Sequence, residues 1–109
     1  MFRDLTWSKT EKDVAKTIYA NAYDKECRAI LARLKQMTSE ISDPEGIWGI
    51  YDYLSEQRKQ FDGKYDYRYS VLPMVFARLI REGWLTEADL KGLREDKLEI
   101  IGRILRLGE

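Results

Sequence analysis

The side chains best suited to do chemistry lie between residues 48 and 70, where aromatic rings alternate with charges. Trp48, Asp52 and Ser55 follow helical spacing on one side of a predicted helix, and Arg58 falls on the adjoining apolar side. A guanidinium in an apolar row either extends from the edge of a core or binds a partner's carboxylate or carbonyl. Asp52 cannot pair with Arg58 along the helix, because their spacing places them about 120° apart. We therefore expect Arg58 to pair with another element or another chain. Trp48 alone would be typical of a core, but beside polar groups and an arginine it is typical of a protein-binding site.

Enzymatic and metal chemistry have few candidates in this chain. It contains no histidine and no glycine-rich phosphate loop, and its one cysteine, Cys27, falls on an apolar helical stripe where a small buried hydrophobe is expected. The carboxylate pairs Glu11/Asp13 and Glu95/Asp96 lie at predicted helix starts, where we interpret them as solvated partners of the helix dipole. We expect a protein that is not an enzyme and holds no metal or cofactor.

Length and charge narrow the possibilities further. The 109 residues suit a single domain, and 19 basic residues balance 19 acidic ones, which leaves no field to attract nucleic acid. Residues 79–86 and the short helix after them imitate a helix-turn-helix, but Glu87 and Asp89 at the start of that helix would face phosphates. No uncharged apolar run is long enough to span a bilayer, so we expect a cytoplasmic protein without a transmembrane segment.

The first predicted element is one long helix over residues 8–43, opened by a capping box from Ser8 to Glu11. Apolar residues then alternate at steps of four and three: Tyr23, Cys27, Ile30, Leu34, Met37 and Ile41. Some 33 helical residues would span about 50 Å, whereas a compact domain of this length is roughly 35 Å across. The helix must therefore overhang, and a second copy of the chain is the simplest cover for its apolar stripe.

A second helix is predicted from about Pro44 to Asp62, with Asp43 as its N-cap and Gly63 as the left-handed residue that ends it. The short loop before it makes the two helices an antiparallel hairpin. We expect a homodimer whose interface uses one row from each helix: Ile30, Leu34, Ile47 and Leu54.

The remaining residues predict further helices. Tyr65, Tyr67 and Tyr69 alternate as in a strand, but one strand would have nothing to pair with, so we expect them to pack between the two halves of the protein or to face a partner. A helix from Ser70 to Gly83, a short helix after Thr86 and a last helix from Asp96 follow. The predicted fold is all-α: a stem of two long antiparallel helices (8–63) and a small helical head (66–107), in one domain over residues 1–109.

One stretch resembles a known family. The residues that carry the resemblance are Ile47-Trp48-x-x-Tyr51-Asp52-Tyr53-Leu54-Ser55-x-x-Arg58, then Phe61-Asp62-Gly63-Lys64-Tyr65-Asp66-x-Arg68-x-Ser70-Val71, and Val75-Phe76-Ala77-x-Leu79. They are similar to the fluorescence recovery protein family of cyanobacteria. The resemblance implies an all-helical homodimer that binds the C-terminal domain of photoactivated orange carotenoid protein and speeds its return to the orange form. Quenching of the phycobilisome would then end, at the cytoplasmic face of thylakoids.

The resemblance also implies a partner-binding role for Trp48, Asp52 and Arg58. Tyr51 stands where the family usually has a histidine, and Met74 stands where it has an aromatic residue, so both belong to the predicted partner-binding set. Two functions stay open at this point. One is the regulator of orange carotenoid protein, and the other is a dimeric adaptor of the same fold whose client is unrelated to light.

Overall fold

The computed structural model describes residues 5–108, and all of its elements are helical. They are α1 (Lys9–Glu40), α2 (Gly46–Lys64), α3 (Leu72–Arg81), the 3-10 helix η1 (Glu87–Leu90) and α4 (Glu95–Leu107). No β-strand forms within residues 5–108, so the predicted all-α class is confirmed. The short helix after the stretch that imitates a helix-turn-helix is η1, which is a single 3-10 turn and too short to fill a DNA groove.

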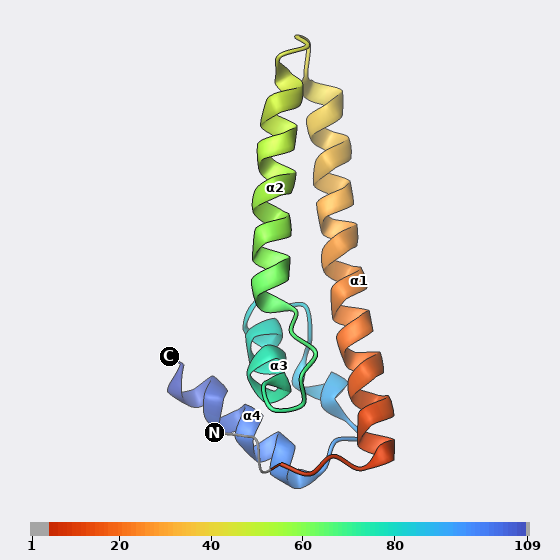
Figure 1. Ribbon diagram of the computed structural model, residues 1–109, viewed down its shortest axis with the longest axis vertical. Helices are drawn as coiled ribbons and strands as arrows, with labels where there is room; N and C mark the ends of the chain where they lie inside the picture. Colours follow the sequence, from red (N-terminus) through yellow and green to blue (C-terminus); the bar gives the residue numbers. More distant parts are fainter. Residues whose placement is uncertain (1–4, 109) are drawn as a thin grey trace.

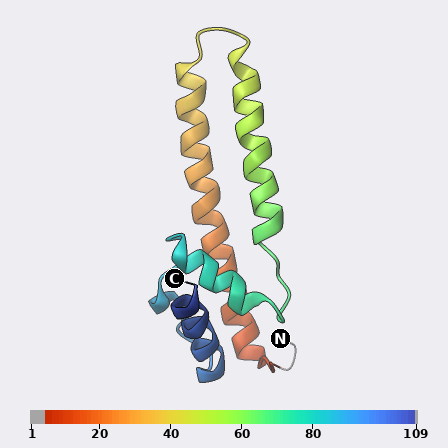
Figure 2. The same ribbon diagram turned by 90° about the vertical axis from the view of Figure 1, so that its left-hand side faces the viewer.

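The two longest helices set the shape of the molecule. Figure 1 shows α1 and α2 running antiparallel, with α3, η1 and α4 gathered around the N-terminal half of α1. Figure 2 shows the free end of the hairpin clear of these other helices. The chain measures 54 × 24 × 21 Å, and the 32 residues of α1 span about 48 Å of that length. Residues 27–60, here called the arm, contain no buried side chain.

The hydrophobic core lies at the other end, where α3 packs against α4 and both cover α1. Helix α3 is its centre, because Leu72, Phe76 and Leu79 are fully buried and Ile101 of α4 meets them. The predicted stop at Gly83 is confirmed by its φ of 88°, which favours glycine. Helices α3 and α4 begin at Leu72 and Glu95, within two residues of their predicted starts.

Helix α1 begins with the predicted capping box. The Glu11 amide donates to Ser8 Oγ, and the Ser8 amide donates to the Glu11 carboxylate, each at 3.1 Å. The buried residues of α1 then follow helical spacing on the face toward the core: Glu11, Ala15, Ile18, Ala22 and Glu26. The interpretation of Glu11 as a solvated partner of the helix dipole is therefore wrong, since its side chain is 1% exposed.

The second helix begins and ends two residues later than predicted. Asp43 caps the turn that leads into α2, because its carboxylate accepts the Glu45 amide and its carbonyl accepts the Gly46 amide, each at 2.8 Å, and α2 itself begins at Gly46. Gly63 does not end it, because its φ is not positive and the helix continues through Lys64. Lys64 is buried and bound to carboxylates of α1 and of the residue after α3, so a tertiary contact extends the last turn.

The tyrosines after α2 pack as a connection and not as a strand. Tyr65 lies 4.9 Å from Tyr23 and 5.4 Å from Tyr19, ring centre to ring centre, both edge to face. Tyr67 lies 4.8 Å from Tyr19, and Tyr69 lies 5.4 Å from Trp7. These contacts fasten the connection to α1, as the packing interpretation of the cluster predicted.

Candidate functional site

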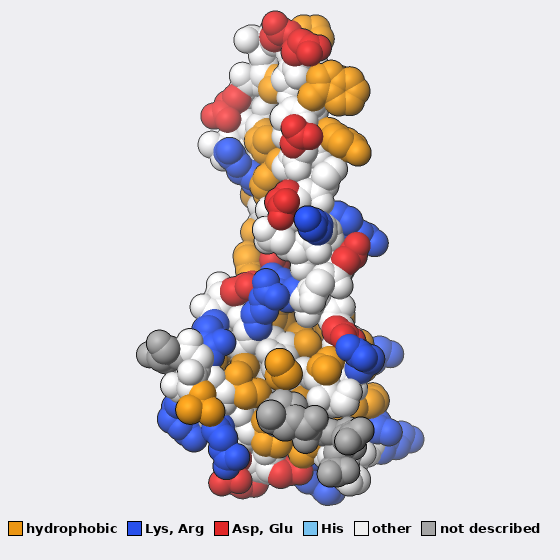
Figure 3. All heavy atoms as spheres, turned by 60° about the vertical axis from the view of Figure 1, so that its left-hand side comes forward, with side chains coloured by type: hydrophobic (Ala, Val, Ile, Leu, Met, Phe, Trp, Pro, Cys, Tyr) orange, Lys and Arg blue, Asp and Glu red, His pale blue; other side chains and the backbone are white. Residues whose placement is uncertain are grey.

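One face of α2 in the arm carries a row of uncovered apolar side chains. Trp48 is 56% exposed and Tyr51 is 62% exposed, with Ile47 and Leu54 completing the row at helical spacing. The rings of Trp48 and Tyr51 lie 6.4 Å apart, edge to face. Figure 3 shows hydrophobic side chains projecting from the free end of the hairpin, with acidic groups beside them. We call Ile47, Trp48, Tyr51 and Leu54 the arm row.

The arm row is exposed because α1 covers a different face of α2. The half-buried positions of α2 in the arm are Gly46, Ile50, Tyr53 and Gln57, which also follow helical spacing. One residue further on turns the helix by about 100°, so Ile47, Tyr51 and Leu54 point away from the face that packs on α1. An apolar row of this kind on a rigid helix is typical of a surface that another protein covers.

Arg58 continues the arm row toward the core, and its surroundings differ from the prediction. Its Nε lies 3.2 Å from Asp62 Oδ1, one turn further along the same helix, and the two side chains are 75% and 64% exposed. The expectation that the pairing must come from another element or chain was therefore wrong, because it tested Asp52 and overlooked the carboxylate at i+4. An exposed pair of this kind contributes little stability, so the guanidinium can exchange Asp62 for another acceptor.

Asp52 is exposed on the same helix, and within residues 5–108 its carboxylate forms no ion pair. Asp52 follows Trp48 by one helical turn, so the aromatic ring and the carboxylate lie on neighbouring parts of one surface. Trp48, Tyr51, Asp52 and Arg58 are thus brought together by α2 alone, within about three turns of helix.

The other predicted site residues lie elsewhere. Ile30 and Leu34 are half-buried on α1. Met74 is 54% exposed on α3, beside a groove of about 350 Å³ that Val75 and Ile104 also line. Sixteen residues of α2 separate Trp48 from Lys64, which places the arm row about 24 Å along the helix from the end nearest α3. The structure therefore does not bring Met74 together with the arm row.

Two buried ion clusters at the junction of α1 with the other helices were not predicted. Lys64 Nζ lies 2.6 Å from Glu26 and 2.6 Å from Glu82, and its side chain is 3% exposed. Tyr65 Oη donates to the other oxygen of Glu26 at 2.8 Å. Burial, together with this carboxylate, raises the pKa of the Tyr65 phenol, so it stays protonated as a donor. Burial alone would raise the pKa of Glu82, but the hydrogen bonds from Lys64 and Arg78 outweigh it and lower the pKa.

The second cluster joins Glu11 of α1 to Lys97 of α4. The two charged groups lie 3.0 Å apart with side chains 1% exposed, and the Arg94 amide donates to Glu11 at 2.8 Å. Lys97 also donates to the Thr6 carbonyl. Burial would raise the pKa of Glu11, but the Arg94 and Ser8 amides and Lys97 outweigh it, so the pKa is lowered. On the buried face of α1, the apolar residues Ala15, Ile18 and Ala22 lie between two acidic residues, Glu11 and Glu26. These two carboxylates were the signal in the sequence for the two clusters.

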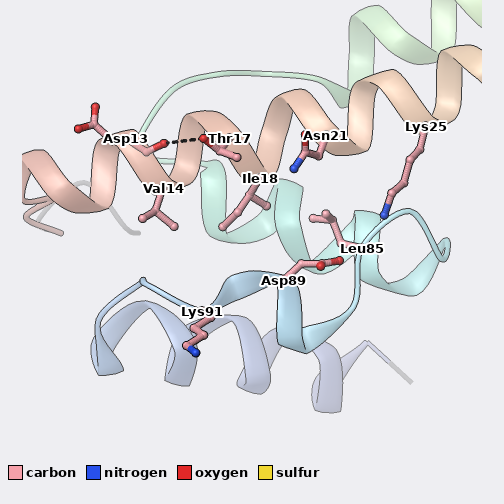
Figure 4. A pocket seen from close by; sticks show the side chains of 9 residues that line it. All are labelled: Asp13, Val14, Thr17, Ile18, Asn21, Lys25, Leu85, Asp89 and Lys91. Atoms are coloured by element: carbon pink, nitrogen blue, oxygen red, sulfur yellow. Dashed lines mark hydrogen bonds between the residues drawn. The ribbon is translucent and has the colours of Figure 1, made fainter.

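A groove of about 360 Å³ between α1 and η1 is a candidate for a reaction site (Figure 4). Its floor is formed by Val14, Ile18 and Leu85, and charges of both signs surround it. The Asp89 carboxylate accepts the Thr86 amide at 2.9 Å, as the cap of η1. No nucleophile stands beside a base here, and no group of three or more potential metal ligands occurs within residues 5–108.

Cys27 is half-buried in the arm and not fully buried as predicted. Burial, with Glu26 and Asp24 nearby, raises the pKa of its thiol, so the residue is poorly suited to act as a nucleophile. Within the described residues, no helix is both long enough and apolar enough to cross a membrane. The exposed arm row is the feature of the described residues that suits a protein-binding surface.

Comparison with known proteins gives a family match over most of the chain. Residues 7–104 match a protein family described as "Photoprotection regulator fluorescence recovery protein". The fluorescence recovery protein of Synechocystis sp. PCC 6803 is 37% identical over 101 residues, which are 93% of this chain and 93% of that protein.

Solved structures give the same result. The fluorescence recovery protein of Fremyella diplosiphon is 44% identical with a TM-score of 0.85, and the match covers 93% of this chain and 99% of that one. The Synechocystis protein is 36% identical with a TM-score of 0.86 at the same coverage. The chain therefore belongs to the fluorescence recovery protein family of photoprotection regulators.

Proposed function

We propose that this chain is a non-enzymatic regulator that binds photoactivated orange carotenoid protein and accelerates its return to the resting orange form. The observation that carries the proposal is the arm row, an uncovered apolar surface with Asp52 and Arg58 beside it. A protein that holds two separated domains close together raises their effective concentration and favours the closed state that it binds. No catalytic group is needed for that effect.

The proposed partner surface has an apolar centre and charged flanks. Trp48 and Tyr51 supply the rings that an apolar patch on the client would cover, while Arg58 donates to a client carboxylate or carbonyl. We place the contact on the C-terminal domain of the carotenoid protein, with Met74 as a separate contact near α3. Such binding would end quenching of the phycobilisome at the cytoplasmic face of thylakoids.

We also propose a homodimer built on the arm. The arm has no buried side chain, and a helical hairpin of this length gains most of its stability from tertiary packing. A second copy related by a two-fold axis would cover Ile47 and Leu54 and complete the packing around Ile30 and Leu34. The exposed row supports this proposal, because an isologous interface needs one self-complementary apolar patch.

The adaptor with a client unrelated to light is the second candidate. Tyr51 and Met74 favour it, because both are more than half exposed and both differ from the residues that the family resemblance implies. Substitutions on an exposed surface leave the fold unchanged and alter the partner that the surface fits.

The test is a recovery assay. Purified chain is mixed in the dark with photoconverted orange carotenoid protein, and the return of the orange absorbance is timed. The first proposal expects a faster return that Trp48→Ala slows, while Leu107→Ala, at an exposed position outside the arm, leaves the rate unchanged. If the orange absorbance returns no faster with the chain than without it, the first proposal is rejected and the adaptor remains.

A further inference from the structure

A groove of about 530 Å³ lies between α1 and the connection that follows α2, away from the arm row. Its lining joins three aromatic rings to three charged side chains: Tyr19, Tyr67, Tyr69, Lys12, Lys16 and Asp13. We call it the tyrosine groove.

The rings give the tyrosine groove an apolar wall. Tyr67 lies between the other two, 4.8 Å from Tyr19 and 5.6 Å from Tyr69, edge to face in both cases. Its hydroxyl lies 3.5 Å from the Lys12 carbonyl, which is a long and weak contact. Rings set edge to face leave slots that suit a proline or a flat apolar side chain.

The lysines beside this wall are unusual in their spacing. Lys9, Lys12 and Lys16 lie at steps of three and four on one face of α1, where like charges repel. Within residues 5–108 none of the three forms an ion pair. Lys12 Nζ lies 5.2 Å from the centre of the Tyr69 ring, which ties this positive row to the groove. Among the groove-lining residues, Asp13 is the one carboxylate, against two lysines.

We propose that the tyrosine groove binds an extended acidic segment of a partner protein. Lys12 and Lys16 are four residues apart, about 6 Å along the helix. Alternate side chains of an extended chain repeat at about 6.6 Å on one side. Acidic residues at alternate positions thus match the two lysines, and the residues between them face the rings. The inference does not depend on the function proposed above.

A labelled twelve-residue peptide that alternates glutamate with phenylalanine, which favours an extended strand, tests the proposal by fluorescence anisotropy. Wild-type chain should bind it, and the same peptide with glutamine for glutamate should bind about tenfold more weakly, because two charge pairs are lost. The double variant Lys12→Glu/Lys16→Glu should lose about as much affinity, and Tyr67→Ala should lose part of it. Its matched control is Lys35→Glu/Lys59→Glu, which makes the same change of net charge on the arm and should bind like wild type.

Other results would overturn the proposal. Equal loss in the control variant would mean that net charge alone attracts the peptide. Tighter binding of single-stranded DNA or phosphatidylglycerol vesicles, with the same dependence on the lysine pair, would assign the groove to a phosphate ligand. A change of oligomeric state in the groove variant without any peptide binding would make the surface an interface between copies of this chain. Thermal melts of each variant separate these results from loss of the fold.

Discussion

Replacing Arg58 with leucine separates a structural role from a binding role. The guanidinium makes one exposed ion pair, to Asp62 at 3.2 Å. Losing such a pair costs about 0.2–1 kcal/mol, and leucine has nearly the same helix propensity as arginine. We therefore expect the free energy of unfolding of Arg58→Leu to stay within about 1 kcal/mol of wild type.

Client binding should respond much more strongly. If the guanidinium exchanges Asp62 for a client carboxylate or carbonyl, the substitution removes charge-assisted hydrogen bonds that contribute about 1.5–3 kcal/mol. That loss corresponds to a roughly ten- to hundredfold weaker complex. Arg58→Lys should recover part of the binding, because it keeps the charge but not the planar pair of donors. Asp62→Asn removes the internal competitor and should leave binding unchanged or slightly stronger.

The measurement is the dark recovery rate and the affinity for orange carotenoid protein, with thermal melts and light scattering on each variant. Wild-type recovery by a folded Arg58→Leu chain would refute the role given to Arg58 and favour the adaptor. A large loss of stability would refute the view that the Asp62 pair is weak.

The remaining predictions concern assembly and the buried charges. Ile47→Glu places a charge in the proposed interface, so light scattering should report a monomer that remains helical by circular dichroism, whereas Leu107→Glu at an exposed end should not alter the mass. Lys64→Met leaves Glu26 buried without its cation and should lower the free energy of unfolding, measured in urea, by about 3–5 kcal/mol. Adding Glu26→Gln should restore most of that stability. A double variant that is no more stable than Lys64→Met would contradict the pairing. The pKa of Glu11 is lowered from its ordinary value of 4.5, so its ionised form stabilises the fold above that pH and the benefit is lost as pH falls through the lower, folded pKa. The stability difference between wild type and Glu11→Gln should therefore shrink from pH 7 to pH 3, and an unchanged difference would show that hydrogen bonding without charge explains the contact.

Features set by neighbouring residues were predictable from the sequence. The capping box at Ser8, the stop at Gly83 and the cap of η1 by Thr86 each depend on backbone groups within a few positions. The arm row also follows from helical spacing, since α1 packs on a different face of α2 from the one that carries Trp48 and Tyr51. Chain length likewise predicted the long axis, because α1 exceeds the width of a compact domain.

Features set by distant residues were not predictable. Lys64 and Glu26 are 38 positions apart, and Lys97 and Glu11 are 86 positions apart. Helical spacing shows that Glu11 lies on the buried stripe but not which cation meets it, so a solvated carboxylate was the simpler interpretation. The Lys64–Glu26 contact explains the error at Gly63, because burial of Lys64 holds the helix for two residues beyond its predicted end at Asp62.

The residues proposed for the dimer and those proposed for the client share one face of α2. Ile47 and Leu54, proposed for the dimer, flank Trp48 and Tyr51, proposed for the client, along α2. A client that covers Tyr51 must therefore also cover or displace whatever packs on Ile47, since side chains four residues apart on one helix lie about 5–6 Å from each other. Binding of a second copy and of the client are then linked equilibria, and a variant that breaks the dimer changes client affinity without touching a client contact. Arg58 lies at the end of the row nearest the core, one turn beyond Leu54 and beside Asp62. A variant at Arg58 that changes the recovery rate while the oligomer keeps its mass therefore identifies a contact with the client.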